Sequence, residues 1–246
     1  MKDNSIRIAN CSGFYGDKLS IARDMIEGGP IDVLTGDYLA ELTMTILYNQ
    51  KLKRGEEHGY VGTFLKQFKD VAKLAQEKDI KIVTNAGGLN PSSMAAAVEE
   101  IVQELNLDLK VAYIEGDDLM PRIDELYKGG ETLTNIDKAL DLQNYKKKPI
   151  TANAYLGAWG IKEALDNGAD VVICPRVTDA AVVIGPAAWK YNWSRDQYDE
   201  LAGALAAGHI TVSYTHLRAH ETPEHLVCRR RLEKKKGGGG GGGGGG

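Results

Sequence analysis

The chain has 246 residues, of which 43% are hydrophobic, so it is long enough for one large domain, or a fragment of one, with a sizeable core. Its formal net charge is −4, and because seven basic and three acidic residues lie from Thr211 onward, the preceding part carries −8, which argues against nucleic acid as a partner. No apolar run approaches the roughly 18 residues of a membrane span, the start is too polar for a signal peptide, and the cysteines are three and far apart, so we expect a cytoplasmic protein without disulfides or membrane contact.

Short apolar runs alternate with segments of helical spacing along most of the chain. Glycine or polar residues follow each run, as at strand ends, and residues 128–148 are polar enough to predict a surface excursion. In chain order we expect a strand at 6–10, a helix at 18–27, a strand at 31–35, helices at 38–53 and 63–78, a strand at 81–85, a helix at 95–105 capped by Ser92 or Ser93, strands at 110–114 and 150–155, a helix at 158–167, a strand at 170–174 and a helix at 180–189.

This alternation predicts an α/β fold. Strands separated by helices pair in parallel through right-handed crossovers, so the units should form a mainly parallel sheet. The segment 168–173 suits either a doubly wound, Rossmann-like sheet or a TIM-type barrel. We favour the doubly wound sheet because of the glycines in the first loop and the long excursion before the strand expected at 150–155.

Polar residues follow every expected strand. In both architectures ligands bind at the carboxyl ends of the strands, so these residues would form one polar ring around a site. The ring consists of Asn10, Ser12 and Asp17 after the first strand, Asp37 and Glu41 after the second, Asn85 and Asn90 after the third, Glu115, Asp117 and Asp118 after the fourth, Asn153 and Tyr155 in the fifth, and Arg176 and Asp179 after the sixth.

Part of this ring is expected to bind a cofactor or another ligand. Gly13 and Gly16, before a helix, could let backbone N–H groups approach a phosphate or carboxylate; the alternative is that they only allow a tight turn, since the three-glycine dinucleotide motif is absent. Asn85 could orient a ligand carbonyl or belong to an ordinary turn. The predicted binding set is Ser12, Gly13, Gly16, Asp17, Asn85, Asn90 and Asn153, with the cofactor itself unassigned.

The remaining charged residues are candidates for catalysis. Glu115, Asp117 and Asp118 crowd three carboxylates into four residues, which suits a divalent cation or a carboxylate with a raised pKa; the alternative is a helix cap. Arg176 could hold a carboxylate or phosphate in a bidentate fork with Asp179 positioning it, or form a structural ion pair. These five residues form the predicted catalytic set, and no metal is assigned.

The C-terminal segment 211–246 has a different character. His216, His220, His225 and Cys228 have spacings found in zinc sites. The string from Val212, however, resembles the in-frame translation of a transposase-type sequencing adapter, and three Lys followed by ten Gly resemble translated A and G runs. We therefore expect a truncated domain at 1–210 and a non-native tail at 211–246 whose polyglycine end is disordered.

Seven strings in one order carry a resemblance to a known family. They are Cys-Ser-Gly-Phe-Tyr-Gly-Asp-Lys from Cys11, Asp-Val-Leu-Thr-Gly-Asp-Tyr-Leu-Ala-Glu from Asp32, Thr-Asn-Ala-Gly-Gly-Leu-Asn-Pro from Thr84, Glu-Gly-Asp-Asp from Glu115, Ala-Asn-Ala-Tyr-Leu-Gly from Ala152, Arg-Val-Thr-Asp from Arg176 and Ala-Gly-His-Ile from Ala207. On these motifs the chain resembles the N-terminal domain of the acyclic terpene utilisation A (AtuA) family, and the family pattern continues beyond the last of them.

The resemblance implies a role in bacterial breakdown of acyclic isoprenoids such as citronellol and geraniol, through acyl-coenzyme A intermediates. The expected partner is a small acyl or carboxylate ligand, with a second copy of the chain or another pathway subunit as a further possibility. Two functions stay open. One is an enzyme in which Arg176 holds the acid group and Asp117 or Glu115 acts as acid, base or metal ligand; the other is a non-catalytic ligand-binding or scaffold subunit.

Overall fold

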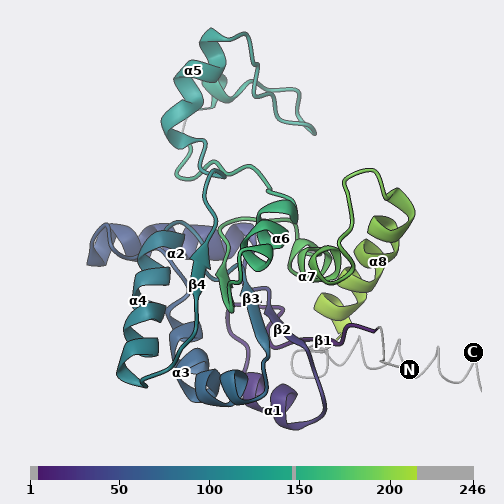
Figure 1. Cartoon of the computed structure of the whole chain (residues 1–246). Helices are drawn as coiled ribbons and strands as arrows, with labels where there is room; N and C mark the ends of the chain where they lie inside the picture. Colours follow the sequence, from purple (N-terminus) through teal and green to yellow (C-terminus); the bar gives the residue numbers. More distant parts are fainter. Residues whose placement is uncertain (1–4, 146–147, 215–246) are drawn as a thin grey trace, which may run out of the picture.

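Five short strands form one open, all-parallel sheet. The computed structural model describes residues 5–145 and 148–214, and within them the strand order is β1-β2-β3-β5-β4, with β1 and β4 at the two edges (Figure 1). The doubly wound arrangement is therefore confirmed over the barrel. The strands are β1 (Ile8–Asn10), β2 (Val33–Gly36), β3 (Lys81–Thr84), β4 (Val111–Tyr113) and β5 (Val171–Ile173).

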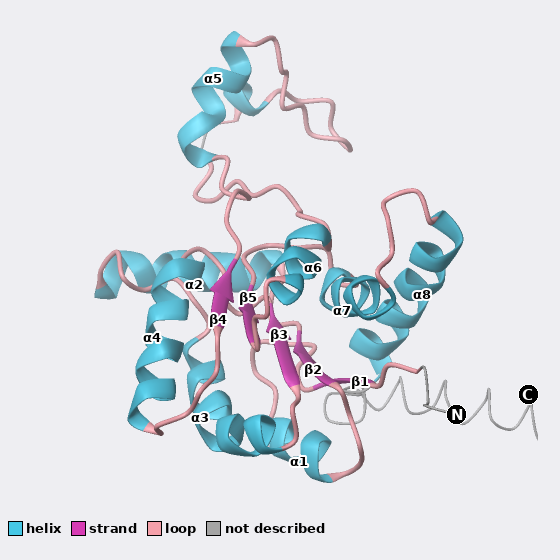
Figure 2. Cartoon of the chain, viewed as in Figure 1, coloured by secondary structure: helices cyan, strands magenta, loops and turns pink. Residues whose placement is uncertain are grey.

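Helices cover both faces of this sheet (Figure 2). The chain moves in one direction across the sheet from β1 through β2 and β3 to β4, and then moves back to β5. Because crossovers between parallel strands share one hand, the helices that follow this reversal lie on the opposite face of the sheet. One face carries α1 (Ile21–Glu27), α3 (Gly62–Glu77) and α4 (Pro91–Glu104); the other carries α6 (Trp159–Asp166), α7 (Ala181–Tyr191) and α8 (Tyr198–Tyr214).

Two hydrophobic cores result, one on each face. Side chains alternate along a strand, so Leu34 and Ile82 pack with α1, α3 and α4, while Val33 and Val83 pack with α6 and α7. Burial on both faces explains why the strands appear as continuous apolar runs. The helix α2 (Glu41–Arg54) buries Thr43, Met44 and Leu47 and runs past the carboxyl ends of the strands.

The predicted strand at 150–155 is wrong. Within this segment only an isolated bridge forms, Asn153 with Asp118, and a second one, Leu156 with Val177, follows directly after it; none of the residues 150–155 is buried. Its alternating sequence resembles a strand, but it is the returning half of a neck that connects the sheet to the excursion. The outgoing half is residues 117–120, and the two halves are joined by hydrogen bonds from Leu119 N to Ala152 O and from Ala154 N to Asp117 O, both 2.7 Å.

The predicted polar excursion is confirmed and is longer than expected. Residues 118–157, here called the excursion, lie between β4 and α6 and project beyond the carboxyl edge of the sheet around α5 (Figure 1). They include two short 3₁₀ turns, Met120–Arg122 and Leu142–Asn144, and the helix α5 (Ile123–Lys128). Among its described residues no side chain is buried.

Two helix predictions need correction, and one segment lies outside the structure. The cap of α4 is Asn90, whose side chain accepts from Ser93 N, and not Ser92 or Ser93, because Pro91 already occupies the first helical position. The helix α8 was not predicted, and it continues to Tyr214, into the segment expected to be tail. His216, His220, His225 and Cys228 lie outside the described residues. No helix in the described ranges is both long and apolar enough to cross a membrane.

Candidate functional site

The loops after β2 and β3 meet at Asn85. Its Nδ2 donates a hydrogen bond to Asp37 Oδ1, and its Oδ1 accepts one from Tyr38 N at 2.8 Å. Asp37 N in turn donates to Ser12 O at 2.8 Å, which adds the loop after β1. A Cβ atom at Gly87 would lie 2.6 Å from Cys174 O, so glycine is needed where the β3 loop packs against the end of β5. Four strand ends are thus drawn into one cluster.

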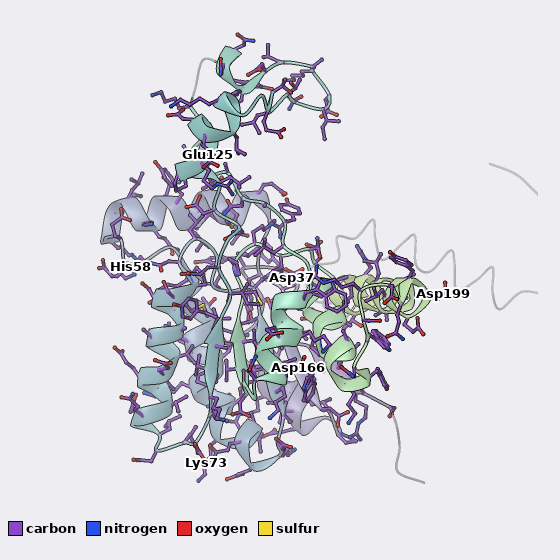
Figure 3. The ribbon with its side chains drawn as sticks, turned by 45° about the horizontal axis from the view of Figure 1, so that its top comes forward. Asp37, His58, Lys73, Glu125, Asp166 and Asp199 are labelled. Carbon is purple, nitrogen blue, oxygen red and sulfur yellow. The ribbon has the colours of Figure 1, made fainter. Side chains whose placement is uncertain are left out.

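Asp37 is the most perturbed carboxyl group of this cluster. It is 5% exposed and lies near the centre of the molecule, whereas Glu125 lies on the excursion (Figure 3). Burial raises its pKa to about 7; the Asn85 hydrogen bond opposes this, the charge of Asp179 adds to it, and Arg176 lowers it. A carboxyl group with this pKa can both take and release a proton near neutral pH.

Arg176, on the loop after β5, is buried but sparsely bonded. Its Nη1 donates to Leu39 O at 2.9 Å. Two carboxylates lie at ion-pair distance but beyond hydrogen bonding, Asp179 at 3.6 Å from Nη1 and Glu41 at 3.7 Å from Nη2. Within residues 5–145 and 148–214, the guanidinium therefore makes one hydrogen bond although it carries five N–H donors.

Two exposed side chains cover Arg176. The Tyr155 ring lies over the guanidinium, with 4.2 Å from Arg176 Cζ to the ring centroid, and is 52% exposed. The Tyr155 hydroxyl donates to Glu41 Oε1, and this hydrogen bond lowers the pKa of Glu41. Because Tyr155 comes from the neck and Glu41 from α2, displacing these two side chains would open Arg176 to a ligand.

The three clustered carboxylates at the end of β4 point in different directions. Asp117 is buried, its Oδ2 accepts from Asn153 Nδ2 at 2.8 Å and from Arg176 N at 3.2 Å, and burial raises its pKa. Asp118 is exposed and accepts from Met120 N at 2.9 Å, while Glu115 is exposed as well. In the described ranges no group of three His, Cys, Asp or Glu side chains is placed to hold a metal ion.

The side chain of Asp17 occupies the loop after β1. Asp17 Oδ2 accepts from Gly13 N at 2.8 Å and from Ser12 Oγ at 3.3 Å, so a protein carboxylate occupies the position in which a phosphate would meet the Gly13 amide. Gly16 is exposed, and α1, which follows, has only seven residues. These contacts favour the tight-turn interpretation of the two glycines.

Asn90, Cys11 and Cys174 have structural roles around the site. Asn90 Nδ2 donates to Glu56 O at 2.8 Å and to His58 O at 3.3 Å, and its Oδ1 caps α4, so its polar atoms are engaged. Cys11 and Cys174 are buried, and burial raises the pKa of both thiols, that of Cys11 to about 12. Neither thiol forms a reactive thiolate near neutral pH.

The structure thus unites Asn85, Asp117, Asn153, Arg176 and Asp179 from the predicted sets. Asp37, Glu41 and Tyr155 belong to the predicted polar ring, but their roles do not follow from the sequence. The sequence feature that could have identified the role of Asp37 is its position: like Asn85, it directly follows a buried strand.

Residues 6–212 match the family model of the acyclic terpene utilisation family protein AtuA. No curated protein and no solved structure matches the chain.

Proposed function

We propose a function on the basis of family membership, since the chain belongs to the acyclic terpene utilisation family AtuA. On this premise the chain binds an acyl or carboxylate intermediate of acyclic terpene breakdown at Arg176. It then promotes a proton transfer with Asp37. The observation that carries the proposal is a buried guanidinium with unused donors beside a carboxyl group whose pKa is about 7.

Arg176 is suited to the acid or thioester end of such a ligand. Its planar fork can bind two oxygens at once, and its burial strengthens each charge-assisted hydrogen bond. Asp117 supports this role without touching the ligand, because its carboxylate accepts from Arg176 N and fixes the backbone of the loop. Asp179 and Glu41 balance the positive charge of the guanidinium.

Asp37 takes the acid–base role that the sequence analysis gave to Asp117 or Glu115. Its hydrogen bond with Asn85 orients one oxygen, and its pKa lies where proton transfer in both directions is efficient. A carbonyl held at Arg176 would make the adjacent C–H group more acidic. Asp37 would then remove that proton and return one.

Ligand titration tests the binding step. We expect Arg176→Gln to weaken binding of citronellate, an acyclic terpene carboxylate, by about 10- to 100-fold in isothermal titration calorimetry, because charge-assisted hydrogen bonds contribute about 1.5–3 kcal/mol. Arg122→Gln is the matched control, since Arg122 is an exposed arginine of the excursion. Equal affinity of the Arg176 variant and the unchanged chain would contradict the proposal.

Proton exchange tests the chemical step without knowledge of the full reaction. We expect the chain to replace the protons next to the thioester carbonyl of citronellyl-coenzyme A by deuterium in D₂O, followed by loss of the NMR signal, and Asp37→Asn to stop this exchange while binding persists. If the ligand binds but the unchanged chain shows no exchange, the non-catalytic binding function is the correct one.

A further inference from the structure

The excursion has apolar side chains but no core. Ile123 and Tyr127 of α5 and Leu142 of the second 3₁₀ turn belong to neither hydrophobic core of the body, and no described residue from 118 to 157 is buried. A segment of this length normally covers its apolar side chains with one another. Here they surround a hollow of about 530 Å³, whose wall also includes Met120 and Pro149.

A second hollow lies between the excursion and α2. It measures about 290 Å³, and its wall includes Tyr48 and Leu52 of α2, Asp118, Met120 and Ile150. Met120 belongs to the walls of both hollows, so they adjoin one another. We call the two together the groove. Each lies in or near the size range of small-molecule sites. The wall of the larger hollow is mostly apolar, whereas Lys51, Glu56 and Asp118 make the wall of the smaller hollow as polar as it is apolar.

The groove lies within about 10 Å of Arg176, although Arg176 lines neither hollow. Asp118 lines the smaller hollow, and the preceding residue, Asp117, accepts the hydrogen bond from Arg176 N. Along the neck, the three residues from Asp117 to Met120 span about 10 Å. Along α2, the seven residues from Glu41, beside Arg176, to Tyr48, in the groove, also span about 10 Å. An acyl chain of medium length covers this distance.

We propose that the groove binds the hydrocarbon chain of the ligand whose acid end is held by Arg176. The substrate class is then a medium-length acyl compound, and the excursion is its chain-binding region. The ligand supplies the apolar contacts that the excursion does not make with itself. This inference rests on the proposed function, and the experiment below separates the failure of one from the failure of the other.

The experiment compares two carboxylates that share the acid group and differ in the chain: butyrate and citronellate. Affinities are measured by calorimetry on the full chain and three variants. Ile123→Glu places a charge in the wall of the groove, and Ile136→Glu is its matched control, because Ile136 lies in the excursion, is 98% exposed and lines neither hollow. Arg176→Gln tests the acid end. Neither isoleucine is buried, so both variants keep the body folded.

We expect Ile123→Glu to weaken citronellate by about tenfold or more and leave butyrate unchanged. Ile136→Glu should change neither, and Arg176→Gln should weaken both. If Arg176→Gln weakens both ligands but Ile123→Glu weakens neither, the groove is overturned and the proposed function stands. If Ile123→Glu acts on citronellate but Arg176→Gln acts on neither ligand, the proposed acid site fails and the groove stands. If light scattering shows a dimer that Ile123→Glu dissociates, a second copy covers the groove and the inference is overturned.

Discussion

The body and the excursion of this chain use the same kinds of residue in opposite ways. In the body, aliphatic side chains on both faces of a five-stranded sheet are buried beneath helices. Polar groups at the strand ends, such as Asp37, Asn85 and Asp117, are also buried and hydrogen-bonded, although Asn10 Nδ2 is buried without a partner among the described residues. In the excursion, isoleucine, leucine and tyrosine remain partly or fully exposed around a hollow. The body therefore derives its stability from its own contacts, whereas the excursion has apolar surface available for a ligand.

One matched pair of substitutions tests this contrast most strongly. Ile161 of α6 is fully buried, and a Cβ at Gly185 of α7 would come within 2.5 Å of its Cγ2, so the two helices pack tightly there. We expect Ile161→Ala to lower the free energy of unfolding by about 2–5 kcal/mol. Ile136→Ala, the same change at a 98% exposed position of the excursion, should stay within about 0.5 kcal/mol in urea unfolding. Similar losses at the two positions would remove the contrast.

The pH dependence of stability probes the polar cluster where body and excursion meet. The pKa of Asp37 is raised to about 7 in the folded chain, so the folded state holds this proton more tightly than the unfolded state. Its stabilising contribution is complete below about pH 4 and is lost as the pH rises through about 7. Asp37→Asn cannot titrate, so the stability of the unchanged chain relative to this variant should fall by about 3 kcal/mol between those limits.

Urea unfolding of both chains at several pH values measures this difference. Asp170, an acidic residue of the body that is ion-paired with Lys81 at 2.7 Å, provides a control, because Asp170→Asn leaves the Asp37 titration in place. A pH-independent difference between the unchanged chain and Asp37→Asn would mean that Asp37 titrates alike in the folded and unfolded states.

The smallest effect is expected from removing most of the excursion. Replacing residues 121–149 by a short Gly-Ser linker keeps Asp117 and both halves of the neck, whose ends are already joined by the Leu119–Ala152 hydrogen bond. Since none of the described residues in the replaced segment is buried, the free energy of unfolding should change by about 1 kcal/mol or less, with the body helices retained in circular dichroism. An unfolded product would show that the body depends on the excursion.

Local sequence patterns were enough for most of the fold. Residues 81–85 and 170–174 form strands as expected because continuous apolar runs are what a sheet buried on both faces requires. Residues 150–155 alternate apolar and polar side chains, a pattern that is also typical of strands. They form a neck instead, since strand formation depends on a partner that local sequence does not reveal. The helix α8 was missed because it packs on α7 without a marked apolar stripe: small residues such as Ala204 and Gly208 are buried, while most of its other alanines and glycines are exposed.

The candidate site was harder to predict than the fold. Arg176 and Asp117 could be named because charged residues at strand ends are conspicuous. The importance of Asp37 depends on strand order, because β2 must lie beside β3 for Asn85 to reach it and β5 must follow for Arg176 and Asp179 to set its electrostatics. Its raised pKa comes first from burial, a property of the assembled loops that no local spacing contains.

The neck also determines where this fold can change. The chain enters and leaves the excursion through one pair of hydrogen-bonded segments. Insertions between Leu119 and Ala152 should therefore leave the register of the sheet and the loop of Arg176 unchanged. Doubling the length of such a closed loop costs only about 0.6 kcal/mol in chain entropy. During evolution, or in the laboratory, the excursion can be exchanged as a unit; if it binds the acyl chain as proposed, such an exchange would change chain selectivity and leave Arg176 and its neighbours unchanged.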